Sequence, residues 1–202
     1  MMFVFNEPAY VIRSLKKEGS NKVYLTFDDG PTAETTPAVL DLLKKHNCTA
    51  TFFVIGKHAE KNRFLIERIQ NEGHSLMSHS IDHNYSNYFK NTKKIEKWIQ
   101  KSLEHLAEIS NEDIHYFRPP AGVLNPPLLK AAKNLKVPLI LWTHRFFDTV
   151  FCITTKKIEK KISKIVVGDI ILLHDQQKIK NRTEFLSTLE YLIINLKKLN
   201  LD

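Results

Sequence analysis

The chain has 202 residues and a net charge of +8, with 43% hydrophobic and 26% charged residues. This length suits one domain with a sizeable core, and the composition is ordinary for a soluble globular protein. The longest apolar runs, at residues 137–142 and 170–173, are far too short to span a bilayer, which argues against a membrane-spanning protein.

The excess positive charge comes mostly from lysine, and such a field can attract nucleic acid, an anionic membrane surface or a phosphorylated substrate. The lysines of residues 156–164 alternate with Ile158, Ile162 and Ile165 at helical spacing, which is typical of the solvated face of an amphipathic helix. No nucleic-acid motif accompanies the charge, so we expect no nucleic-acid partner. Peripheral contact with an anionic membrane surface stays open.

The cysteine content gives little indication that the protein resides in an oxidising compartment. Its two cysteines, Cys48 and Cys152, form neither a disulfide framework nor a metal-type pair. Residues 1–8 lack a basic start followed by a long apolar stretch, so we predict no secretory signal. We therefore expect a cytoplasmic protein.

Short β-type runs alternate with longer helical patterns along the chain. In order, we expect a strand at residues 23–26, a helix at 37–46, a strand at 50–55, a helix at 57–72, a strand at 74–78 and a helix at 92–108. There follow a helix at 125–134, a strand at 137–143, a helix at 154–165, a strand at 169–173 and a helix at 183–199. This alternation predicts an α/β fold with a largely parallel sheet or barrel wrapped by helices.

In such folds ligands bind at the carboxyl ends of the strands, so the residues just after each strand are the candidates for a site. The first strand is followed by the stretch TFDDGP, which contains Asp28 and Asp29. Asp-Gly-Pro alone is a good turn. Two adjacent carboxylates behind a buried strand repel each other, however, and this favours a cation nearby.

The third strand is followed by HSIDH, with His79 and His83 four residues apart. On a helical turn the two imidazoles would project to one face and could share a metal ion. A chain with nine histidines can contain such a pair by chance. With Asp29 the pair makes a set of two histidines and one carboxylate, which leaves coordination positions open for water and substrate. Zinc suits these ligands, and iron, cobalt, nickel or manganese remain alternatives.

Two further segments carry chemistry. RPPAG places Arg118 in a loop stiffened by two prolines, where the simplest alternative is a rigid turn with a surface arginine. His174 ends a very apolar strand; it suits proton transfer near neutral pH, and a satisfied core histidine is the competing interpretation.

Together these segments resemble a known family. Residues 26–31, 50–56, 73–83, 118–122 and 171–175 look like the five motifs of the polysaccharide deacetylases, the NodB homology family or carbohydrate esterase family 4. The order and spacing match over about residues 22–199, which implies that residues 1–202 form one such domain with its core at 22–199. The family fold is a distorted (β/α) barrel, usually with seven strands.

The resemblance implies a role for each matching residue. The metal ligands would be Asp29, His79 and His83. The general base, its arginine partner and the general acid would be Asp28, Arg118 and His174. The backbone N–H of Ala121 would face the oxyanion, and Leu172 would line the pocket for the acetyl methyl. A divalent metal, a base and an acid are together sufficient to hydrolyse an acetamide.

The chain also departs from the family pattern. Ala121 stands where an aromatic residue is usual, and Arg145 stands where many members carry an aspartate. Asp148 remains, and we expect it to orient His174 or Arg118. Because Arg145 reverses a charge, it suits a substrate with an anionic group such as phosphate.

We therefore predict a metal-dependent hydrolase that removes the N-acetyl group of an amino sugar in a glycan or glycoconjugate. One alternative is a deacylase that removes another group, such as formyl, from a lipid-linked aminosugar; the space near Leu172 and Trp142 would decide this. Another is an inactive carbohydrate-binding homologue, although the complete set of ligands, base and acid argues against it.

Overall fold

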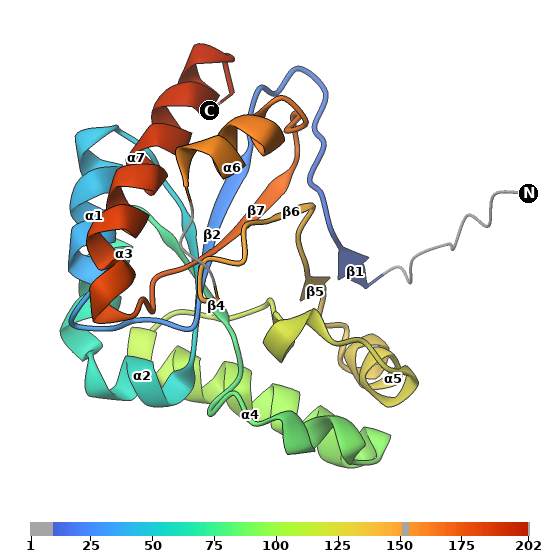
Figure 1. Ribbon diagram of the computed structural model, residues 1–202. Helices are drawn as coiled ribbons and strands as arrows, with labels where there is room; N and C mark the ends of the chain where they lie inside the picture. Colours follow the sequence, from blue (N-terminus) through green and yellow to red (C-terminus); the bar gives the residue numbers. More distant parts are fainter. Residues whose placement is uncertain (1–9, 151–153, 202) are drawn as a thin grey trace, which may run out of the picture.

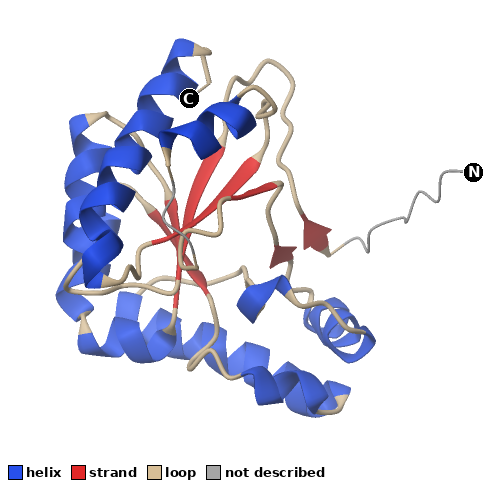
Figure 2. Cartoon of the chain, viewed as in Figure 1, coloured by secondary structure: helices blue, strands red, loops and turns tan. Residues whose placement is uncertain are grey.

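The computed structural model describes residues 10–150 and 154–201. Its central sheet has five parallel strands in the order β4–β3–β2–β7–β6, with helices around it (Figures 1 and 2). The strands are β2 (Tyr24–Asp28), β3 (Thr51–Val54), β4 (Ser75–Ser78), β6 (His144–Arg145) and β7 (Ile170–His174).

Two short strands extend this sheet toward a barrel. β1 (Val11–Ile12) and β5 (Leu139–Ile140) pair in parallel, and single bridges from Phe117 to Ser78 and to Leu139 join this pair to β4. The seven strands of the described residues therefore curve into an incomplete barrel, which confirms the predicted parallel α/β architecture.

The helices cover the outside of the strands. They are α1 (Thr36–Lys45), α2 (Gly56–Lys61), α3 (Arg63–Asn71), α4 (Thr92–Ser110), α5 (Pro126–Leu135), α6 (Thr155–Ile162) and α7 (Arg182–Lys198). Short 3₁₀ turns occur at η1 (Tyr85–Phe89), η2 (Pro120–Gly122) and η3 (Ile179–Asn181). In Figure 1, α1, α3 and α7 lie along one flank of the sheet, while α4 runs along another with α5 near its end.

The alternation of side chains along β2 decides which residues enter the barrel. Leu25 and Phe27 belong to the core beneath the helices. Tyr24 belongs to a small cluster of apolar residues with Phe53, which lies within the barrel. Because successive side chains point to opposite faces, Asp28 follows Tyr24 to the inside, at the carboxyl end of the strand.

Two predicted elements differ from the structure. The helix predicted at residues 57–72 is two helices, because the chain breaks at Asn62, whose side-chain amide donates to the carbonyls of Pro31 and His58. The strand predicted at 137–143 is only Leu139–Ile140. Thr143 then bonds to Ile170 through both its amide and its hydroxyl, and β6 begins at His144.

Within the described residues, no helix combines the length and apolarity that crossing a bilayer requires. The absence of a secretory signal, predicted from residues 1–8, and the interpretation of the Cys152 thiol concern residues outside the described ranges.

Candidate active site

A pocket of about 100 Å³ lies at the carboxyl ends of the barrel strands. Its lining residues are Asp28, Asp29, His79, His83, Tyr85, Ala121, Trp142, Arg145, Thr149, Leu172 and His174. All the predicted site residues except two line this pocket. The exceptions, Arg118 and Asp148, are buried and bond to Asp28 and His174.

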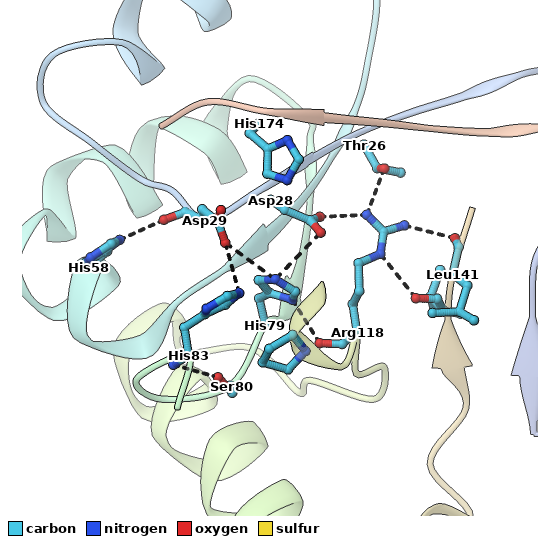
Figure 3. Close-up of polar contacts among 12 residues, drawn as sticks. Thr26, Asp28, Asp29, His58, His79, Ser80, His83, Arg118, Leu141 and His174 are labelled. Carbon is cyan, nitrogen blue, oxygen red and sulfur yellow. Dashed lines mark hydrogen bonds and ion pairs between the residues drawn. The ribbon is translucent and has the colours of Figure 1, made fainter. Parts of the chain in front are cut away.

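The three predicted metal ligands converge. Asp29 Oδ1 lies 3.5 Å from His79 Nε2 and 3.4 Å from His83 Nε2 (Figure 3). The three ligand atoms all lie within 4.8 Å of one another. Asp29 Oδ1 is shielded from solvent and accepts no hydrogen bond from the described residues. A shielded carboxylate oxygen that faces two imidazole nitrogens fits a divalent cation.

The hydrogen bonding of His79 prepares its ring for this role. Its Nδ1 lies 2.8 Å from the carbonyl oxygen of Arg118. A carbonyl only accepts, so Nδ1 carries the proton and Nε2 presents a lone pair to the site. Burial lowers the pKa of His79 to about 3, so the ring is neutral at physiological pH.

The loop that carries both histidines is irregular. The prediction of a helical turn over residues 79–83 is wrong, because Ser80 and His83 have left-handed backbone, with φ of 72° and 53°. The loop is held by amides of α2: Gly56 N donates to Ser80 O and Lys57 N donates to Ile81 O, both at 2.9 Å. Asp29 also has φ of 73°. Such strained residues cluster at functional sites, where the surrounding structure fixes them.

His58 also contributes to the site, although the sequence analysis did not single it out. Its Nδ1 donates to the backbone carbonyl of Asp29 over 2.7 Å (Figure 3). The only signal for it in the sequence is its place shortly after a strand. The bond ties the segment of Asp29 to α2, the same helix that holds the histidine loop.

Arg118 is fully buried, so the alternative of a surface arginine is wrong. Its Nη1 donates to Asp28 Oδ1 over 2.6 Å and to Thr26 Oγ1 over 2.8 Å. Its other nitrogens donate to the carbonyls of Ile140 and Leu141, each over 3.1 Å (Figure 3). With these bonds the guanidinium holds the carboxylate of Asp28 in one orientation.

The protonation of Asp28 reflects two opposing effects. Burial raises the pKa of Asp28 above its ordinary value, while the charge of Arg118 acts in the opposite direction. The carboxylate is therefore more basic than that of an exposed aspartate, yet it keeps a cationic partner.

His174 has a carboxylate partner of its own. Asp148 Oδ1 lies 2.8 Å from His174 Nδ1, and Asp148 Oδ2 accepts from the backbone N–H of His174 over 2.7 Å. Of the two partners expected for Asp148, His174 and Arg118, Asp148 bonds to His174. Burial lowers the pKa of His174, but the hydrogen bond and charge of Asp148 outweigh it and raise the pKa to about 9. The imidazole is therefore protonated at neutral pH.

The apolar part of the pocket is also tightly defined. Ala121 has φ of 55° in the turn η2, and the hydroxyl of Tyr88 donates to Pro120 O over 2.7 Å. A Cβ on Gly122 would lie 2.4 Å from the ring of Trp142, so the turn packs directly on that indole. Ala121, Trp142 and Leu172 therefore lie around one small volume.

The chain is similar to several known deacetylases. The family profile described as polysaccharide deacetylase matches residues 15–140. A peptidoglycan-N-acetylglucosamine deacetylase of Bacillus cereus is 31% identical over 180 residues, covering 87% of this chain and 82% of that protein. A chitooligosaccharide deacetylase of Azorhizobium caulinodans is 31% identical over 78% of this chain and 75% of its own length. Some relatives are longer: the chain spans 34% of the peptidoglycan-N-acetylglucosamine deacetylase PgdA of Listeria monocytogenes.

Solved structures show the same fold. A peptidoglycan N-acetylglucosamine deacetylase in complex with an N-hydroxybenzamide superposes with a TM-score of 0.83 at 28% identity, over 95% of this chain and 88% of that one. A mutant, with restored enzymatic activity, of a Bacillus anthracis pseudoenzyme from carbohydrate esterase family 4 gives a TM-score of 0.80 at 25% identity. That match covers 96% of this chain and 68% of the other.

Proposed function

Because this chain belongs to the polysaccharide deacetylase family and has its distorted-barrel fold, we propose that it hydrolyses the N-acetyl group of an amino sugar in a glycan. The products are acetate and a free amine. The observation that carries the proposal is the convergence on one pocket of a metal-type triad, an aspartate paired with arginine and a histidine paired with aspartate.

The triad of Asp29, His79 and His83 would hold a divalent metal ion. Its nitrogen and oxygen donors suit zinc, which we propose as the metal. Co²⁺, Ni²⁺, Mn²⁺ or Fe²⁺ can bind to the same donors. When bound, such an ion supplies Lewis acidity to the acetyl carbonyl and to water.

Asp28 acts as the general base. It lines the pocket beside Asp29, and its Oδ2 lies 3.6 Å from His79 Nε2, so its carboxylate faces the triad. The guanidinium of Arg118 holds Oδ1, which leaves Oδ2 to take a proton from the attacking water.

The pocket is small, with a volume of about 100 Å³, and we propose that it takes the acetamido group. Leu172 and Trp142 offer apolar contact to the acetyl methyl, and the backbone N–H of Ala121 donates to the oxygen that becomes negative during the reaction. The sugar itself lies over the mouth of the pocket, where Tyr85 is half exposed.

His174 acts as the general acid. Its Nδ1 is held by Asp148, so Nε2 is the nitrogen available to the pocket. With a pKa of about 9, the ring carries at neutral pH the proton that the departing amine needs.

We also propose that the catalytic domain extends over about residues 22–199. The family profile ends at residue 140, yet β7, which pairs with β2 in the middle of the sheet, supplies both Leu172 and His174. A fragment that stops near residue 140 would lack the general acid and the strand beside Asp28.

The test is acetate and amine release from an N-acetylglucosamine tetramer by the zinc-loaded protein. The wild type should release both products in equal amounts, and Asp28→Asn should reduce kcat by about 10²–10⁴-fold because it removes the base. Asp113→Asn makes the same change at an exposed residue and should leave kcat unchanged. A parallel N-formyl tetramer separates a deacetylase from a deformylase. Absence of release by the metal-loaded wild type from either tetramer, and also from a tetramer that contains N-acetylmuramic acid, would contradict the proposal.

A further inference from the structure

Arg145 lines the pocket, and no carboxylate among the described residues forms an ion pair with it. It lies at the end of β6 and lines the pocket together with Leu172 and His174. Its Nε is shielded from solvent and makes no hydrogen bond within residues 10–150 and 154–201. The guanidinium thus brings a positive charge to the pocket without a bonded carboxylate, and an incoming oxyanion would pair with this charge.

The carboxylates nearest the pocket are already engaged. Asp28 pairs with Arg118, and Asp148 pairs with His174. The third carboxylate, that of Asp29, faces His79 and His83. The positive charge of Arg145 is therefore left without a matching carboxylate among these groups.

Aromatic rings hold the guanidinium in place. Its central carbon lies 4.4 Å from the centroid of the Phe147 ring and 5.8 Å from that of Trp142. Stacking on a ring uses the flat face of a guanidinium and leaves its edge for a bidentate contact with a carboxylate or phosphate. Arg145 is thus arranged to bind an anion without a large loss of side-chain entropy.

The strand register places this anion next to the scissile group. Arg145 on β6 is the direct partner of Leu172 on β7. Neighbouring strands lie about 4.8 Å apart, and Leu172 lines the space proposed for the acetyl methyl. A group that contacts Arg145 would therefore lie beside the acetamido group of the sugar being deacetylated.

Lys161 of α6 donates to the backbone carbonyl of Arg145, and its Nζ lies 6.0 Å from the Phe147 ring. Lys161 does not itself line the pocket, so the guanidinium of Arg145 is the cation of β6 that a bound sugar would meet. A neutral sugar offers nothing that matches this charge, whereas an anionic sugar does.

We infer that the pocket selects an N-acetylated sugar that carries an anionic substituent beside its acetamido group, with Arg145 as the residue that binds the anion. The inference rests on the proposed deacetylase function and names the substrate class within it. An ether-linked carboxylate and a phosphate ester share the chemistry that Arg145 recognises.

Matched substrates test the inference. One pair is the N-acetylglucosamine tetramer and a peptide-free tetramer of alternating N-acetylglucosamine and N-acetylmuramic acid, which adds a carboxylate. The other pair is N-acetylglucosamine and its 1-phosphate, in which the phosphate is on the carbon next to the one that carries the acetamido group. For at least one pair, kcat/KM should favour the anionic member about tenfold or more, the size expected of a charged hydrogen bond. The pair that shows the preference identifies carboxylate or phosphate.

Variants locate the effect. Arg145→Gln should abolish the preference, and Arg145→Lys should restore part of it because the charge remains while the planar fork is lost. Arg63→Gln makes the same change at an exposed arginine and should keep the wild-type preference. Equal kcat/KM for both members of both pairs, or a preference that survives in Arg145→Gln, would overturn the inference.

Calorimetric binding of the same sugars to the zinc-loaded protein separates this inference from the proposed function. Tighter binding of an anionic sugar that depends on Arg145, without amine release from any substrate, supports the anion site and refutes the deacetylase. Amine release from neutral and anionic sugars alike, with equal affinities, refutes the anion site and leaves the deacetylase intact.

Discussion

His174 and Asp28 each have one bonded neighbour of opposite charge, which shifts the pKa against the effect of burial. Asp148 raises the pKa of His174 against the effect of burial, and Arg118 opposes the rise that burial imposes on Asp28. In our proposal, these two pairs place an acid and a base beside the same small pocket at the same pH. Because the carboxylate of Asp28 has a cationic partner and the imidazole of His174 has an anionic one, a base and an acid can exist at the same pH.

The acid–base assignment predicts a shifted pH profile for Asp148→Asn. A general acid works while protonated, so wild-type kcat should fall as pH rises through about 9. Without the charge of Asp148, burial dominates and the pKa of His174 should drop to about 6.5 or lower. At pH 8 the protonated fraction, and with it kcat, should then fall at least about thirtyfold. The measurement is kcat against pH from 5 to 10 for the wild type and Asp148→Asn.

Asp113→Asn, an exposed change of the same kind, serves as the control and should keep the wild-type profile. An alkaline limb that stays near pH 9 in Asp148→Asn would show that His174 is not the acid or that Asp148 does not set its pKa.

Among the helices, α2 forms hydrogen bonds to two loops of the site, the loop from His79 to His83 and the segment of Asp29. Its first residues, Gly56 and Lys57, bond the histidine loop through their amides, and His58 bonds the carbonyl of Asp29. All three proposed metal ligands thus depend on this one short helix. Metal ligands that are oriented by hydrogen bonds to neighbouring residues bind a metal ion more tightly than ligands without such bonds.

This arrangement predicts that His58→Ala weakens metal binding without removing a ligand. Loss of the bond to Asp29 should reduce zinc affinity by about 10–100-fold. Competition with a chromogenic chelator measures the affinity directly. His115→Ala, at an exposed position, should match the wild type. An unchanged affinity in His58→Ala would mean that the Asp29 segment holds its shape without α2.

The long helix α4 supports the site from outside the barrel. Ile99 is fully buried in the cluster that also contains Phe117, the residue before Arg118. Ile99→Ala should lower the free energy of unfolding by about 2–5 kcal/mol through loss of burial and the resulting cavity. Urea denaturation measures this, with the exposed Lys101→Ala expected within about 0.5 kcal/mol of the wild type. A loss below about 1 kcal/mol for Ile99→Ala would contradict tight packing beneath Phe117.

Sequence patterns predicted the elements with strong periodicity and missed those that depend on distant partners. The buried face of α4 can be recognised in the sequence from apolar residues at helical spacing. Every predicted helix is present in the structure, although the one predicted at residues 57–72 is divided into α2 and α3. The break at Asn62 was not predictable, because it depends on a bond to Pro31, which is remote in sequence. The irregular loop from His79 to His83 looked like a helical turn since spacing alone cannot reveal bonds to α2.

At the scale of the whole molecule, alternation of strands and helices predicted the parallel barrel and placed its site at the strand ends. The individual motifs occupy segments from residue 26 to residue 175, and only the fold brings them to one pocket. The sequence allowed either His174 or Arg118 as the partner of Asp148, and in the structure Asp148 bonds to His174 at the end of β7. His58 had no motif and emerged only from the folded structure.

We propose that one pocket combines a metal site with a separate base. The most direct measurement is the zinc content of reconstituted, dialysed protein together with acetate release, for the wild type, Asp28→Asn and His79→Ala, each checked for folding by circular dichroism. We expect one zinc per chain and activity in the wild type, one zinc without activity in Asp28→Asn, and neither in His79→Ala. A folded wild type that retains no metal, or a metal-free His79→Ala that still releases acetate, would show that this combination is wrong.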